Sequence, residues 1–464
     1  MRFLCLCSQR RITMMTSIRS LSWYQGQAMI LGLSLMGVVL IALISMYSVG
    51  HLISDKTKQT HAVDAAAYSG ALIQARALNM QAYINLAQIG HQMAMAHLVT
   101  LGSWAKWAST EAKSLSRSNP PAWVIATHFG AKHGAAYTQA ARAYALQGIA
   151  NQGNLLYQQF AEHDEIVEKV LSKVSYAIQQ SMNKARDQAI EEVLRQNYVN
   201  HSIQKVGSLP LQAGKSRSLS WWVEETNKGR LTSLFRPRAN YRSLIQDVAK
   251  VYHFLDERQH VAKSLLPVSE RCPMWRHELR RQGSTILNAQ GNWQSLDTQS
   301  YHALRSNRWI GCYYREYPMG WGWVPGQSTT VPQELVYAEN PPGDFSSEDF
   351  WRWVKRTTKW NIFGGSDNPL ANSRAISERH RWLGGGLAPY VDVINADRQS
   401  SLKFVLSVKQ DELQTHSLLV KAAAETFFER PVARKDGLFE KANLWHPYWQ
   451  ARLSYLPGSV TPIW

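Results

Sequence analysis

The chain has 464 residues, 45% of them hydrophobic, with 51 Lys or Arg against 34 Asp or Glu and a formal net charge of +17. This composition is ordinary for a folded protein, and the length allows two or three domains. The basic residues are scattered, without an RNA-binding signature, helix-turn-helix spacing or a long Lys/Arg block. We therefore expect a solvated basic surface and no nucleic-acid partner.

Residues 28–49 are the single long apolar run and carry no charged side chain. As a helix, at about 1.5 Å per residue, the run reaches roughly 33 Å and can cross the hydrocarbon core of a bilayer. Four arginines and no acidic residue precede it. Because an excess of basic residues stays in the cytoplasm, we expect residues 1–27 to be a cytoplasmic basic tail and residues 50–464 to lie outside.

A cleaved signal peptide is the alternative interpretation, with Ser48-Val49-Gly50 as the cleavage site. The apolar core of a signal peptide normally spans about 7–15 residues. The run here is longer, which favours a retained transmembrane helix.

Residues 61–101 contain no proline and are rich in alanine, which predicts one long helix that continues the membrane segment outward. Steps of three and four residues place a seam of small and apolar side chains on one face of this helix. The seam includes Ala71, Ala75, Leu78, Ala82 and Asn85. Because alanine lets a second helix approach closely, we expect the seam to contact a partner helix, with Asn85 setting the register.

Pro120-Pro121 should end this helix, because the residue before a proline disfavours helical geometry. Two further helices are predicted over residues 123–151 and 155–196. Together the three form an antiparallel bundle, a helical stalk over residues 50–205. The histidines of this region share no i, i+4 ligand spacing, so we predict no metal or cofactor in it.

After residue 206 the helical periodicity fades, and Pro, Gly, Trp and Arg become frequent. Short strands are predicted at 309–314, 390–394 and 404–408, and helices at 244–255, 349–358 and 418–428. The sequence thus predicts an α+β fold: a single N-terminal transmembrane helix, then the stalk, then an α+β distal domain over residues 206–464.

Cys272 and Cys312 lie on the expected outer side, where a disulfide persists. We predict that they are bonded to each other; two buried free thiols are the alternative. Two cysteines without a Cys-x-x-Cys motif do not make a zinc site, so no metal is expected there.

No nucleophile elbow, Walker loop, His-Glu-x-x-His or dinucleotide fingerprint occurs, so we predict no catalytic residue and no cofactor. Gly320-Trp321-Gly322-Trp323 and Gly384-Gly385-Gly386 are interpreted as turns. Eight tryptophans lie between residues 275 and 360. They indicate core packing, with a glycan-stacking platform as the alternative.

Several motifs are similar to a known family. Two of them lie at the start of the apolar run and in the alanine-rich helix: Gln25-Gly26-Gln27-Ala28 and Asp64-Ala65-Ala66-Ala67-Tyr68-Ser69-Gly70-Ala71. Two more follow in the same helix: Arg76-Ala77-Leu78-Asn79 and Tyr83-Ile84-Asn85. This N-terminal region resembles TadG-like proteins of the Tad/Flp pilus-assembly system. Near the C-terminus, Phe427-Phe428-Glu429-Arg430-Pro431 and the segment from Asn443 to Leu453 resemble large members of the same group.

The resemblance implies a non-catalytic, single-pass protein of the bacterial inner membrane, with its bulk in the periplasm and pilus or secretion proteins as partners. Prepilins of this system are cut after a glycine and carry Glu five residues later; counted from Gly26, that position is Leu31. A permanently anchored assembly factor is therefore expected, with Asp64 as a candidate partner contact. The alternative is a membrane-anchored envelope enzyme or glycan-binding protein that uses residues 275–360, with peptidoglycan as its ligand.

Overall fold

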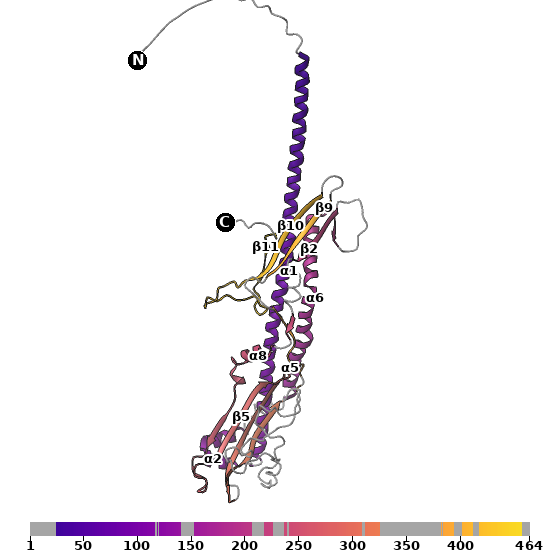
Figure 1. Ribbon diagram of the computed structural model, residues 1–464. Helices are drawn as coiled ribbons and strands as arrows, with labels where there is room; N and C mark the ends of the chain where they lie inside the picture. Colours follow the sequence, from indigo (N-terminus) through magenta and orange to yellow (C-terminus); the bar gives the residue numbers. More distant parts are fainter. Residues whose placement is uncertain are drawn as a thin grey trace, which may run out of the picture.

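The computed structural model describes residues 25–116, 118, 120–140, 153–206, 218–225, 236–238, 241–308, 311–324, 382, 384–393, 401–411 and 417–456. The fold is α+β, as predicted. Its spine is the helix α1 (Gln25–Ser116) of 92 residues. Figure 1 shows α1 projecting alone above the body and then running down through its whole length.

Helix α1 passes through Gly50 without a break and ends at Ser116, just ahead of Pro120-Pro121 as predicted. The next predicted helix is divided in two. Helices α2 (Ala122–Phe129) and α3 (Ala131–Ala140) meet at Gly130, whose φ of 94° ends α2. The remainder of that prediction, residues 141–151, lies outside the described residues.

The chain returns along α1 through α5 (Gly153–Glu165), the π-helical turn η1 (Ile166–Leu171) and α6 (Ser172–Asn197), close to the predicted 155–196. The two helical segments are antiparallel. Three contacts show this: Gly70 lies against Ile190, Gln81 bonds Ser175, and His91 meets His163.

The sheet beside the upper part of α1 has the strand order β1-β2-β9-β10-β11. Its strands are β1 (Ser202–Lys205), β2 (Ser218–Glu225), β9 (Ser401–Asp411), β10 (Ser417–Phe428) and β11 (Trp449–Ser454). Strand β1 is parallel to β2, and the other pairs are antiparallel.

The prediction of a helix over residues 418–428 is wrong, because this segment is strand β10. Strand β10 pairs with β9 on one side and β11 on the other. Its buried Ala422 and Ala424 pack in the same core as Ala66 and Ala67 of α1. Burial of the alanines of this strand against an alanine-rich helix overrides the helix propensity of alanine.

A second sheet, the antiparallel meander β4-β5-β6-β7, lies along the last third of α1. Its strands are β4 (His260–Lys263), β5 (Glu278–Leu287), β6 (Trp293–Asn307) and β7 (Gly311–Val324). A disulfide joins Cys272, ahead of β5, to Cys312 in β7, with the Cα atoms 6.1 Å apart. A short pair, β3 (Arg236–Arg238) with β8 (Tyr390–Asp392), lies with α8 (Arg242–Ala249) and the 3-10 turn η2 (His253–Leu255) between the two sheets.

Gly320 and Gly322 lie within strand β7, not in a turn as the sequence indicated. A Cβ atom on Gly322 would lie 2.1 Å from the carbonyl oxygen of Ser103 in α1. Glycine is needed here because the helix backbone crosses the strand at direct contact.

The strand-rich half of the chain lies alongside the helical half, not beyond its end (Figure 1). Val63 and Ala71 of α1 share one core with Trp221 and Phe404 of the upper sheet. Met95 and Val99, further along α1, share another core with Trp293 and Val324 of the lower sheet. Residues 50–205 and 206–464, predicted as separate stalk and head, thus bury their apolar surface against each other.

Candidate functional site

The N-terminal third of α1 is bare. Every side chain from residue 28 to residue 54 is exposed. Within the described part of the chain, α1 alone is long and apolar enough to cross a membrane, and none of its apolar window is buried. So much continuous apolar surface is unfavourable in water. This segment fits a single-pass membrane anchor.

From Gln59 onward one face of α1 is buried, and this buried face is partly polar. Gln59 Nε2 donates to the carbonyls of Val408 and Leu418, at 3.3 and 3.4 Å. Further down the helix, Thr426 Oγ1 donates to the Ala71 carbonyl at 2.8 Å. Because buried polar groups must be paired, these bonds fix the register of the upper sheet along the helix.

Asn79 holds the edge strand β11 by two reciprocal bonds. Its Nδ2 donates to the carbonyl of Trp449, and its Oδ1 accepts from the Trp449 backbone N–H, both at 2.9 Å. Asn85 Nδ2 donates to the carbonyls of Val391 and Leu444, both at 2.7 Å. The two chain ends quoted above for their family resemblance therefore contact each other through these two asparagines.

The predicted partner seam faces the chain's own elements. Ala71, Ala75, Leu78, Ala82 and Asn85 are all 2% exposed or less. Ala71 packs with Ile190 of α6, while Ala75 and Leu78 pack with Met182 of α6 and Phe428 of β10. Asp64 is half-buried on the same helix. Contact of Asp64 and of this seam with another protein stays a prediction.

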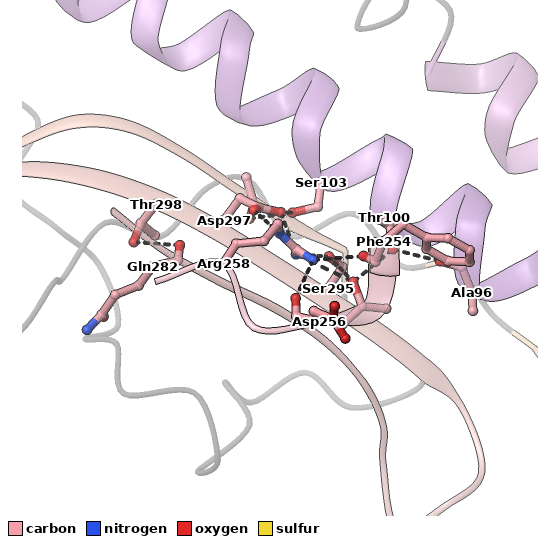
Figure 2. A network of polar contacts seen from close by, with 12 residues as sticks. Ala96, Thr100, Ser103, Phe254, Asp256, Arg258, Gln282, Ser295, Asp297 and Thr298 are labelled. Carbon is pink, nitrogen blue, oxygen red and sulfur yellow. Dashed lines mark hydrogen bonds and ion pairs between the residues drawn. The ribbon is translucent and has the colours of Figure 1, made fainter. Parts of the chain in front are cut away.

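Figure 2 shows the polar network that joins α1 to the lower sheet. The guanidinium of Arg258 binds the Asp297 carboxylate twice, at 2.8 and 3.1 Å, and Ser103 of α1 donates to the same carboxylate at 2.8 Å. Thr100 of α1 bonds Thr285 at 2.8 Å, and Thr285 donates to Ser295 at 2.9 Å.

The charges in this network are deeply buried. The side chains of Asp297 and Arg258 are 1% and 13% exposed. Burial raises the pKa of Asp297, and the hydrogen bonds from Arg258 and Ser103 oppose that rise. A buried pair of this kind adds little net stability, but removal of one partner leaves an uncompensated charge. The network therefore locks α1 to the sheet in one arrangement.

A second buried carboxylate lies on the upper sheet. Glu425 of β10 forms ion pairs with Lys403 of β9 and Arg452 of β11. Burial alone would raise its pKa, but the hydrogen bonds and charges of Lys403 and Arg452 prevail and lower it. Glu425 therefore ties the three strands together as a carboxylate.

Of the eight tryptophans between residues 275 and 360, the structure describes the side chains of Trp275 and Trp293, and both pack against other residues. Trp293 is 4% exposed, and its Nε1 donates to Gln92 of α1 at 3.1 Å. Trp275 lies against Tyr314, with ring centroids 5.3 Å apart, beside the disulfide. Trp309, Trp351, Trp353 and Trp360 lie outside the described residues, as does the helix predicted at 349–358. Glycan stacking on this region stays a prediction.

Within the described residues, no group of three or more His, Cys, Asp and Glu side chains could hold a metal ion. A histidine pair does occur between α1 and α5, with His91 Nδ1 2.8 Å from His163 Nδ1. Burial and the neighbouring His163 lower the pKa of His91. No local sequence pattern could have found this pair, because its members come from two different helices.

A protein-family model matches the exposed N-terminal part of α1 and the first residues of its buried part. Residues 26–76 match the family model described as “Putative Flp pilus-assembly TadE/G-like”. This segment is TadE/G-like. The resemblance stated from Gln25-Gly26-Gln27-Ala28 and the alanine-rich motif is thereby confirmed, and it places the segment in a pilus-assembly context. No curated protein and no solved structure matches the chain.

Proposed function

We propose that the protein is a non-catalytic assembly factor of a Tad/Flp-type pilus or a related secretion apparatus, anchored once in the bacterial inner membrane. The observation that carries the proposal is the TadE/G-like segment 26–76, in which an exposed apolar helix leads directly into a folded body. Residues 1–27 face the cytoplasm, and residues 50–464 face the periplasm, by the distribution of basic residues.

The continuous helix makes the protein a strut. From Gly50 to Ser116 α1 runs for roughly 100 Å at 1.5 Å per residue. Both sheets are fixed along that length by buried polar bonds. Pilus components that bind the body are therefore held at defined heights above the membrane.

The exposed stripe of α1, formed by Tyr68, Met80, Tyr83 and Leu86, is the surface we assign to these partners. These side chains are 42–58% exposed, although the opposite face of the same helix is buried. Exposed aromatic and apolar side chains in a cluster are typical of interaction sites. Tyr68 lies within the TadE/G-like segment, and the other three residues of the stripe follow that segment closely.

A photocrosslinking amino acid at Tyr83 tests this function in cells of the source bacterium. We expect covalent adducts with proteins of the pilus or secretion machinery. The same amino acid at Tyr176, which is 65% exposed on α6, serves as the matched control. Identical adducts from the two positions, or adducts with no envelope-machinery protein at Tyr83, would contradict the proposal.

A further inference from the structure

A pocket lies between the C-terminal end of α1, helix α3 and the lower sheet, far from the membrane helix. Its volume is about 240 Å³, the size of a small organic molecule. Trp107 and Glu111 of α1, Tyr137 of α3 and Arg281 of β5 contribute to its wall. None of these residues belongs to the TadE/G-like segment or to the network of Figure 2.

Polar groups in this wall lack partners. Glu111 is 2% exposed and lines the pocket. Trp107 Nε1 and Arg281 Nε are buried, and neither has a hydrogen-bond partner among the residues that the structure describes. Buried polar groups are nearly always satisfied in folded proteins, and each unpaired one costs free energy. Two such donors around one cavity indicate a site whose partner is a ligand.

The wall is held in place for such a ligand. The guanidinium of Arg281 lies over the ring of Trp107, 4.4 Å from its centroid, which fixes both donors. Gly320 of β7 lies directly against Glu111 and Trp107. A Cβ atom at this position would lie 2.8 Å from Glu111 Cβ and 3.0 Å from Trp107 Nε1. The strand thus approaches these two side chains as closely as glycine allows.

The charge of the pocket selects the ligand. Burial raises the pKa of Glu111 to about 8, although Arg281 opposes the rise, so the carboxyl is mainly protonated at neutral pH. The described wall of the pocket then holds no carboxylate to balance Arg281; Asp297, outside the wall, also interacts with Arg281 but is paired with Arg258. The pocket presents a cation together with N–H and O–H donors, which favours an anion that accepts hydrogen bonds.

We propose that this pocket binds a small organic carboxylate. The guanidinium of Arg281 and the indole N–H of Trp107 donate to the carboxylate oxygens, and the protonated Glu111 donates a further hydrogen bond. Tyr137 and the buried Leu279 supply an apolar wall for the carbon body of the ligand. This inference is independent of the proposed role in pilus assembly.

Isothermal titration calorimetry on the full chain in dodecyl maltoside micelles tests the site. Benzoate and acetate are the probes, with benzamide and inorganic phosphate as the comparison ligands. We expect benzoate to bind at a single site with a Kd of about 1 mM or tighter, and benzamide to bind at least about tenfold more weakly. Absence of benzoate binding, or tighter binding of phosphate or benzamide than of benzoate, would overturn the proposal.

Two kinds of variant locate the site. Arg281→Met should lower benzoate affinity at least about tenfold, because it removes the cation. Ala136→Trp should block the pocket without disturbing the core, because Ala136 lines it but is exposed on α3. Ala135→Trp is the matched control, since Ala135 is exposed on the same helix and does not line the pocket. Equal benzoate affinity in the two tryptophan variants would show that the ligand binds elsewhere and would overturn the proposal.

Discussion

Helix α1 has two parts with different environments. Its first third is exposed on all sides, whereas the remaining two thirds are buried on one face against the rest of the protein. Residues 28–54 are exposed on every side and include no Lys, Arg, Asp, Glu, Asn or Gln side chain. From Gln59 onward, buried amides and hydroxyls bond to strands and loops far away in sequence. Apolar surface alone suits a fluid bilayer, whereas paired polar groups fix a single protein arrangement.

The largest expected effect concerns the polar network that joins the buried face of α1 to the lower sheet. Arg258→Met leaves the Asp297 carboxylate buried without its cation, which should lower the free energy of unfolding by about 3–5 kcal/mol. Denaturant unfolding of the purified chain measures the change. Lys250→Met is the control, because Lys250 and Asp247 form an exposed pair that contributes little. A loss equal to that of the control would contradict a locking role for Arg258.

A pH dependence follows from Glu111, the most strongly shifted described carboxyl on α1. Its pKa in the folded chain is about 8, above the ordinary value of 4.5, so the folded state holds the proton more tightly than the unfolded state. Its contribution to stability is fully present below pH 4.5 and is lost as the pH rises to about 8. Glu111→Gln has no such ionisation. The free energy of unfolding of the variant, relative to that of the wild type, should therefore rise by about 4 kcal/mol from pH 5 to pH 9.

Chemical unfolding of both proteins at the two pH values measures that gain. Glu165→Gln, at an exposed position on α5, should show no such gain. A difference between wild type and Glu111→Gln that does not change with pH would contradict burial of an uncharged Glu111.

A charged substitution tests whether the exposed apolar part of α1 spans the membrane. Leu40→Arg places a cation at the centre of the apolar run, which costs about 3 kcal/mol for insertion in a bilayer. We expect a smaller share of the chain in the membrane fraction after cell lysis. Leu52→Arg, beyond the run, should leave that share unchanged. Equal membrane fractions for the two variants would show that residues 28–49 do not form the span.

The smallest expected effect concerns the edge strand. Asn79→Ala leaves the backbone N–H and carbonyl of Trp449 without their partner, for a loss of about 2 kcal/mol. Hydrogen exchange of residues 449–454 measures the local opening of β11. Arg76→Ala, an exposed neighbour on the same helix, is the control. Unchanged protection of β11 would mean that Asn79 does not hold it.

Sequence patterns predicted those features that depend on neighbouring residues. The apolar run, the end of α1 before Pro120-Pro121 and the strand at 404–408 were all accessible from local periodicity and turn chemistry. Strand β10 was not, because alanine favours a helix unless a sheet and a helix enclose it. The pocket was hidden as well, since Glu111 and Arg281 meet only after the meander packs on α1.

The most direct test of the anchored arrangement uses a membrane-impermeant maleimide on intact spheroplasts. A cysteine at the exposed Tyr83 reports on the body, and the native Cys5 and Cys7 report on the segment before the apolar run. We expect Tyr83→Cys to react in intact spheroplasts, and Cys5 and Cys7 to react only after the membrane is permeabilised. Labelling of Cys5 and Cys7 in intact spheroplasts with Tyr83→Cys protected would contradict a periplasmic body on a single membrane helix.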